Sequence, residues 1–199
     1  MKILDIIKQE KIYGIIREDD TKRALELANA YIEGGIKVLE LNCPLEVCEN
    51  ISKKDGVVVA QGGVITKDQA HEALQAGAQI ISSPIFQANL VRFASCYSAF
   101  LIPSVTTPNE AYSAWQAHMP LIKIYPVAEM GGVEYIQDMI KPMPFLNLLP
   151  CGFVKISEVE GYLKAGVCAV GIGRELYAKK DYKEIVDTAK NVVEMVRRI

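Results

Sequence analysis

The chain has 199 residues, of which 50% are hydrophobic, a net charge of −2 and a pI near 5.8. This composition is enough for a sizeable core and fits one domain over residues 1–199, while the weak charge gives no reason to expect nucleic acid or an anionic membrane as a partner. No apolar run approaches the length of a membrane span, and the first fourteen residues lack the apolar core of a signal peptide, so we expect a cytoplasmic protein.

Cysteine and histidine usage points away from metals and disulfides. The five cysteines are an odd number without a C-x-x-C pair, as is typical of reduced thiols in a cytosolic protein. The two histidines lie far apart in sequence, and no H-E-x-x-H motif is present. We therefore expect neither a metal site nor a cofactor.

The chain alternates between two kinds of segment. Ile3, Leu4, Ile6 and Ile7 are spaced as on a helix, so a short amphipathic helix should pack on the domain at the amino terminus. Apolar runs typical of strands then follow at 12–17, 37–43, 57–61, 79–85, 100–105, 121–126, 145–150 and 168–173. Helical patterns lie between them, among others at 19–34, 66–77, 157–166 and 181–199.

Three helix-to-strand junctions resemble one another: YIEGGIKVLEL (31–41), LQAGAQIIS (74–82) and LKAGVCAVG (163–171). Each ends a helix on glycine, which adopts a left-handed turn at little cost, and then begins an apolar strand. Eight strands alternating with helices favour parallel βαβ units closed into a (β/α)₈ (TIM) barrel with an N-terminal capping helix. A doubly wound open sheet is the alternative, but no G-x-G-x-x-G follows the first strand.

Alternate residues of a barrel strand face the interior. In LIKIYP (121–126) the inward set contains Lys123, in KVLELNC (37–43) it contains Glu40, and in IYGIIR (12–17) it contains Arg17. All three lie near the carboxyl ends of their strands, where barrel enzymes have their active sites. The plainer interpretations are a solvated rim lysine and a structural ion pair between Arg17 and Glu40.

The chemistry open to this trio is narrow. A lysine in a mostly apolar cavity with a cationic neighbour loses its proton more easily, and the free amine can attack a carbonyl carbon. Glu40 would then transfer protons as general acid and base, and Arg17 would hold the carboxylate of a 2-oxo acid with its two-pronged guanidinium. This combination predicts a metal-free aldolase acting through Lys123.

The stretch from Lys123 to Pro126 (K-I-Y-P), followed by Gly131 and Gly132, resembles the Schiff-base signature of the 2-keto-3-deoxy-6-phosphogluconate (KDPG) and 4-hydroxy-2-oxoglutarate (KHG) aldolase family. The blocks EGGIKVLEL (33–41), AQGGVIT (60–66), EALQAGAQIISSP (72–84) and AVGIGRELY (169–177) are similar to other blocks of that family in the same order. The resemblance implies a homotrimer of (β/α)₈ barrels that cleaves such acids to pyruvate and an aldehyde, glyceraldehyde 3-phosphate or glyoxylate. It assigns the Schiff base to Lys123 and the proton transfers to Glu40.

The chain also departs from the family pattern. Most members read E-L-T-L-R after the glutamate, with an arginine for the substrate carboxylate, whereas this chain has Pro44 at that place. The related phosphogalactonate aldolases use an arginine that ends the first strand instead, and Arg17 matches it. Gly63 stands where a threonine often lies near the pyruvate moiety, so we place it, with Arg17, at the substrate carboxylate.

The seventh and eighth strand-to-helix loops are where a barrel commonly holds phosphate through backbone N–H groups. Here the candidates are Gly152, Gly171, Ile172, Gly173 and Arg174. Phe153 replaces the second glycine of the family's G-G pair and narrows this site. The substrate is therefore expected to be a small 2-oxo acid, either phosphorylated or, if phosphate does not bind, a smaller one such as 4-hydroxy-2-oxoglutarate.

Two other functions stay open. Phosphosugar isomerases and epimerases share the barrel and the phosphate loops, but they do not need an inward lysine. A non-catalytic aldolase relative that binds a small 2-oxo acid or a phosphosugar is compatible with Pro44, Gly63 and Phe153, whereas Lys123 and Glu40 argue against it. Turnover of 2-oxo acids separates these possibilities.

Overall fold

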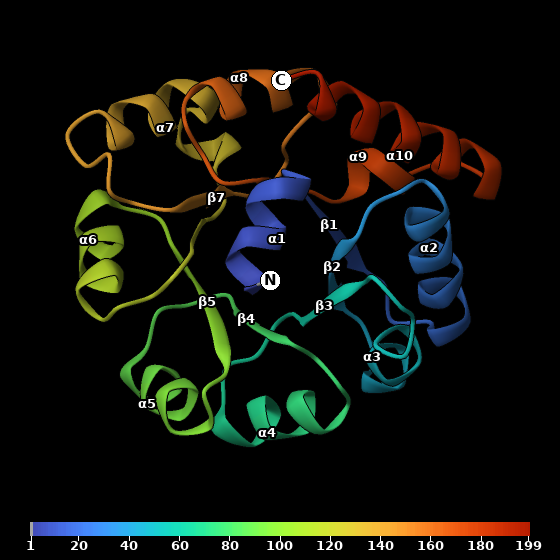
Figure 1. The fold of residues 1–199 in the computed structure, drawn as a ribbon, viewed down its shortest axis with the longest axis horizontal. Coiled ribbons are helices and arrows are strands. Elements are labelled where there is room, and N and C mark those ends of the chain that lie inside the picture. Colours follow the sequence, from blue (N-terminus) through green and yellow to red (C-terminus); the bar gives the residue numbers. More distant parts are fainter. Residues whose placement is uncertain (1) are drawn as a thin grey trace.

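In a computed structural model that describes residues 2–199, eight parallel strands form one sheet in the order β7-β6-β5-β4-β3-β2-β1-β8. The two ends of the sheet meet, because the Cys168 N–H at the start of the β8 segment donates to the Leu148 carbonyl of β7 at 3.0 Å. Helices surround the strands as an outer ring (Figure 1). The predicted (β/α)₈ barrel is confirmed.

The strands agree with the predicted runs in number and order, although most are shorter. Their bounds are β1 (Ile12–Arg17), β2 (Val38–Asn42), β3 (Val58–Gln61), β4 (Ile80–Ser83), β5 (Phe100–Val105), β6 (Ile122–Ile124), β7 (Leu148–Pro150) and β8 (Val170–Ile172). The trimmed residues lie at strand ends, where some of them make single hydrogen bonds to a neighbouring strand. Asn147, for example, precedes β7 but already accepts from the Ile122 N–H at 3.0 Å.

The helices alternate with the strands. They are α1 (Ile3–Glu10), α2 (Thr21–Glu33), α3 (Leu45–Ile51), α4 (Lys67–Gln75), α5 (Ala88–Tyr97), α6 (Pro108–Gln116), α7 (Gly132–Ile140), α8 (Val159–Lys164), α9 (Arg174–Tyr177) and α10 (Tyr182–Arg197), with 3₁₀ turns η1 (Ala128–Met130) and η2 (Ile156–Glu158). At the three similar junctions, Gly35, Gly77 and Gly166 have φ of +91°, +88° and +98°. The predicted left-handed turns therefore form, and each helix reverses directly into its strand.

Helix α1 lies across one end of the barrel, as seen in the centre of Figure 1. Its Ile7 is fully buried and belongs to the apolar cluster of the barrel interior. Because α1 leads directly into β1, it closes the end where the strands begin. The Lys37 Nζ, just before β2, also pairs with the Glu10 Oε1 at 2.9 Å. The predicted capping helix is present.

The two faces of the strands build two separate apolar clusters. The outward cluster packs against the ring of helices, and the inward cluster contains Tyr13, Val38, Val58, Ala60, Ile80, Ile102, Leu121, Leu149, Cys151 and Ala169. Tyr13, Val38 and Leu121 share strand parity with Arg17, Glu40 and Lys123. The predicted inward direction of these three strand faces is confirmed, and the open end of the barrel is left to the polar residues.

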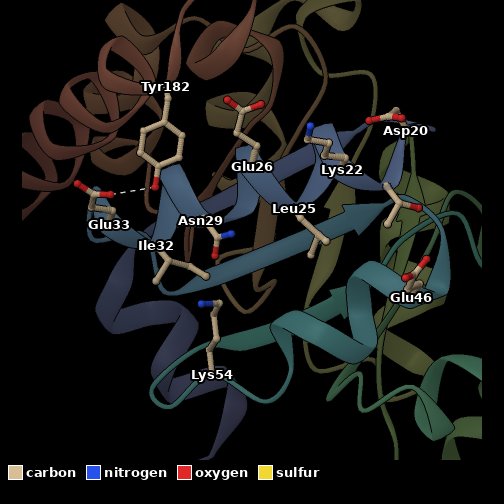
Figure 2. A pocket seen from close by; sticks show the side chains of 11 residues that line it. Asp20, Lys22, Leu25, Glu26, Asn29, Ile32, Glu33, Glu46, Lys54 and Tyr182 are labelled. Atoms are coloured by element: carbon tan, nitrogen blue, oxygen red, sulfur yellow. Dashed lines mark hydrogen bonds between the residues drawn. The ribbon is translucent and has the colours of Figure 1, made fainter.

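A wide surface groove lies outside the barrel, between α2, α3 and α10 (Figure 2). It is lined by Asp20, Thr21, Lys22, Leu25, Glu26, Asn29, Ile32, Glu33, Glu46, Lys54 and Tyr182. Four of its lining residues are acidic and two are lysines, and the Tyr182 hydroxyl donates to Glu33 at 2.9 Å. This groove shares no residue with the predicted site.

Two features are absent from residues 2–199. No group of three or more His, Cys, Asp or Glu side chains there is arranged to hold a metal ion. None of the helices in this part of the chain combines the length and the apolar character needed to cross a membrane.

Candidate active site

Lys123 is the central residue of the short strand β6 and projects into the barrel. The strand lies between β5 and β7. The register partners of Lys123 are Ser104 in β5 and Leu149 in β7. Only 5% of the lysine is exposed. An ammonium buried to this extent needs partners, because its desolvation is costly.

Those partners come from two other strands. Lys123 Nζ forms an ion pair and hydrogen bond with Glu40 Oε2 of β2 and donates to the Ser82 Oγ of β4 at 2.7 Å. Glu40 is 4% exposed and Ser82 is 1% exposed, so the contacts are shielded from water. The amine therefore has a buried proton acceptor in direct contact, which a solvated rim lysine would not have.

Glu40 is held in its ionised form by its neighbours. Burial by itself would raise the pKa of this carboxyl, but the Lys123 charge and hydrogen bond outweigh burial, so the pKa lies below its ordinary value. The Asn42 Nδ2 also donates to Glu40 Oε1 at 3.0 Å. Each carboxylate oxygen thus has a donor, and the side chain is fixed in one orientation.

Arg17 ends β1 at the open end of the barrel. Its strand neighbour is Asn42, and one guanidinium nitrogen lies 3.5 Å from the Asn42 Oδ1. Within residues 2–199 Arg17 makes no ion pair, and Glu40 pairs with Lys123 instead. The interpretation of Arg17 and Glu40 as a structural ion pair is therefore wrong. Asn42 links the two residues, and the exposed guanidinium is free for an anion.

Glycines line the same corner of the mouth. A methyl group on Gly62 would lie 2.5 Å from the Asn42 Oδ1, and one on Gly63 would lie 3.6 Å from the same atom. Gly63 is exposed and has φ of +74°. Pro44, the residue at the family's arginine position, is the N-cap of α3 and offers no donor to the site.

The candidate phosphate residues divide into two groups. Gly171 and Ile172 are buried inside β8, whereas Gly173 and the exposed Arg174 lie at the junction of β8 and α9. Gly171 has a packing reason of its own, because a methyl group there would lie 2.1 Å from the Cys151 Sγ. Gly173 and Arg174 follow the end of their strand, as does the fifth candidate, Gly152, in the loop after β7.

The loop after β7 has a strained backbone. Gly152 and Phe153 have φ of +96° and +56°, and the latter is a conformation that L-residues rarely adopt. The Phe153 side chain is 65% exposed. The phenylalanine is therefore a solvent-exposed residue of this loop and not part of the core.

Two buried groups of the inward cluster lie near the amine. The Tyr13 ring centroid is 5.7 Å from the Lys123 Nζ, and the tyrosine is fully buried. The Cys151 thiol is 1% exposed, and burial raises its pKa to about 12, so it is a neutral filler here and not a nucleophile.

Sequence reasoning missed Ser82, Asn42 and Tyr13 as site residues. Inward parity was a usable signal for each. Ser82 is a polar residue on the inward face of a strand near its carboxyl end, as are the three residues that were predicted. What parity does not reveal is which inward residues share one height in the barrel.

Known proteins resemble this chain over nearly its whole length. A KHG/KDPG aldolase from Escherichia coli K12 is 27% identical over 199 residues, covering 95% of this chain and 93% of the relative. The KDPG aldolase structure from Zymomonas mobilis ZM4 has a TM-score of 0.87 at 24% identity, over 97% of this chain and 96% of that one, and shows the common fold.

A further solved structure is a KDPG aldolase from Legionella pneumophila with pyruvate captured as a covalent carbinolamine intermediate. It has a TM-score of 0.85 at 25% identity and covers 96% of this chain and 98% of that one. The family model for KDPG and KHG aldolases matches residues 3–190. With nearly the whole chain matched, this protein belongs to the KDPG and KHG aldolase family.

Proposed function

We propose that the protein is a class I aldolase that cleaves a 2-keto-3-deoxy-6-phospho sugar acid or 4-hydroxy-2-oxoglutarate to pyruvate and an aldehyde. The observation that supports this most is the buried contact of Lys123 with Glu40 at the open end of the barrel. A structural ion pair at this depth seldom adds stability over apolar packing, whereas a Schiff-base enzyme needs an amine and a proton acceptor together.

The reaction follows from these contacts. Lys123, after giving a proton to Glu40 or water, attacks the 2-oxo carbon, and loss of water leaves an iminium ion. Glu40 removes the proton of the 4-hydroxyl, the C3–C4 bond breaks, and its electron pair moves toward the iminium to form an enamine. The aldehyde leaves, C3 takes up a proton, and hydrolysis releases pyruvate and the free lysine.

Arg17 is the proposed group for the substrate carboxylate. It ends the strand next to Glu40's strand, lies at the mouth and has no anionic partner among residues 2–199. Gly63, beside Asn42, leaves room for the carboxylate and offers a backbone N–H. A guanidinium binds a carboxylate through two parallel hydrogen bonds, which fixes the 2-oxo carbon relative to the amine.

The far end of the substrate would meet the loops after β7 and β8. Gly152, Gly173 and Arg174 are the proposed phosphate contacts, while Gly171 and Ile172 contribute only through the strand that carries this loop. Phe153 occupies part of the approach. The shorter 4-hydroxy-2-oxoglutarate needs none of these contacts, so comparing kcat/KM for the two substrates measures what this loop contributes.

Trapping tests the proposed function. Pyruvate plus borohydride should leave a reduced adduct on the Lys123 peptide, visible by mass spectrometry, because reduction fixes the imine as a stable amine. Lys155, an exposed lysine, is the internal control and should stay unmodified. An adduct elsewhere, or none, contradicts the proposal and favours the isomerase or the non-catalytic barrel, neither of which needs an imine.

We also propose a homotrimer, supported by the family to which the chain belongs. Light scattering should then give about three times the chain mass of 22.0 kDa. A mass of one chain would contradict the proposed trimer but would not bear on the proposed reaction.

A further inference from the structure

Imine formation changes the number of hydrogens that Lys123 can donate. An ammonium carries three N–H groups, and Lys123 uses two of them for Glu40 and Ser82. The iminium nitrogen carries one. Once the proposed imine forms, Glu40 and Ser82 together lose a donor inside a site that is almost completely buried. A buried carboxylate short of a donor is costly, so a replacement has to come from nearby.

The Tyr13 hydroxyl is such a donor, and it is not used in the free protein. Tyr13 is fully buried in the barrel interior, and its hydroxyl has no hydrogen-bond partner. Within residues 2–199, the other buried side-chain atoms without a partner are the Gln61 Oε1, which is an acceptor, and the Tyr162 hydroxyl in α8. Among residues 2–199, the Tyr13 hydroxyl is therefore the one unpartnered buried O–H or N–H group on the inward face that carries Lys123.

The hydroxyl also lies on the correct side of the site. Tyr13 is two residues before Ile15, whose register partner is Glu40, and the Lys123 Nζ is 5.7 Å from its ring centroid. Glu40 and Ser82 are close enough to affect the pKa of the phenol, yet neither forms a hydrogen bond of acceptable geometry with it. Burial raises that pKa well above its ordinary value, with Glu40's charge adding to it, so the phenol keeps its proton and can donate.

We propose that Tyr13 is a positioning residue for Glu40: its hydroxyl donates to the carboxylate when Lys123 turns from Glu40 to the substrate carbon. In the free protein the same hydroxyl is an unsatisfied polar group, which lowers stability. The hydroxyl thus lowers the stability of the free protein and fixes the Glu40 carboxylate in the covalent intermediate. This inference rests on the proposed Schiff-base function.

The consequence is that one substitution should lower activity without lowering stability. Tyr13→Phe removes only the hydroxyl, so the melting temperature should stay level or rise. The rate of proton exchange at the pyruvate methyl in deuterated water, followed by NMR, should fall by about 10-fold or more, because a hydrogen bond to a charged group is lost in the intermediate. Half-saturation of borohydride trapping by pyruvate should rise as well.

Tyr162→Phe is the matched control, since it removes another buried, unpartnered hydroxyl far along the chain. It should leave exchange and half-saturation at wild-type values. Tyr13→Met, which fills the space with a flexible apolar side chain, serves as the second variant if Tyr13→Phe does not fold.

Three outcomes are distinguished. Slower exchange with undiminished melting temperature in a Tyr13 variant supports the role. Wild-type exchange in folded Tyr13→Phe or Tyr13→Met, with the Lys123 adduct still formed, overturns it and leaves the proposed function intact. An absent Lys123 adduct in the wild-type protein overturns both.

Discussion

Glu40 is the residue whose ionisation couples the site to the stability of the protein. Its pKa in the folded state lies below the ordinary value of 4.5, so the unfolded chain binds the proton more readily. The ion pair therefore stabilises the fold at pH above about 4.5, and this contribution is lost as pH falls through the folded-state pKa. Glu40→Gln removes the titration and leaves the Lys123 ammonium without its counter-charge.

We expect Glu40→Gln to lower the free energy of unfolding by up to about 3–5 kcal/mol near neutral pH, and we expect the gap to wild type to narrow on acidification. Urea unfolding across the acidic range measures both. Glu160→Gln is the control, because Glu160 pairs with Lys164 on the exposed face of α8 and its curve should parallel wild type. A gap that stays constant with pH would show that Glu40 is not ionised in the fold.

Substitutions of Arg17 test the proposed contact with the substrate carboxylate. Lysine cannot reproduce the two-pronged contact, so Arg17→Lys should lower kcat/KM by roughly 30- to 1000-fold, equivalent to about 2–4 kcal/mol of transition-state binding. Because Arg17 forms no ion pair with any of residues 2–199, the melting temperature should change little. Arg92→Lys, an exposed arginine on α5 that donates to Asn89, is the control. Unchanged pyruvate half-saturation of Lys123 trapping in Arg17→Ala would mean that the carboxylate is held elsewhere.

For β1, β2 and β6, the sequence predicted which face of the strand is inward but not which inward residues are in contact. Glu40 and Lys123 belong to β2 and β6, which are not neighbours in the sheet. Their contact depends on the stagger of all the strands between them, which is set by packing around the whole barrel. Parity is a local property of one strand and carries no information on this stagger.

The same limit explains the residues that were missed. Ser82 contacts Lys123 only because β4 has its particular height relative to β6. The backbone at Phe153 is another case, because a phenylalanine gives no sequence signal for φ of +56°. By contrast, the junction glycines were predictable, since a helix that reverses directly into a strand requires a left-handed residue whatever surrounds it.

The two ends of the barrel differ: one is open and contains the candidate site, and the other is closed by α1. Arg17 ends β1 at the open end, and Glu40 and Lys123 are the central residues of β2 and β6, while the amino ends of the strands are sealed by α1. The exposed groove between α2, α3 and α10 belongs to neither end (Figure 2). Stability at one end and chemistry at the other should therefore be separable by mutation.

Ile7 tests this separation. It is the fully buried residue through which α1 enters the interior cluster, and Ile7→Ala leaves a cavity that the rigid strand ends cannot fill. We expect a loss of about 2–5 kcal/mol in the free energy of unfolding, measured by urea denaturation, with aldolase activity per folded molecule unchanged. The exposed neighbour Lys8 gives the control, and Lys8→Ala should stay within about 0.5 kcal/mol of wild type. An Ile7→Ala protein as stable as that control would show that α1 does not close the barrel. Loss of activity in the folded variant would instead show that the amino end controls the height of Lys123 and Glu40 at the other end.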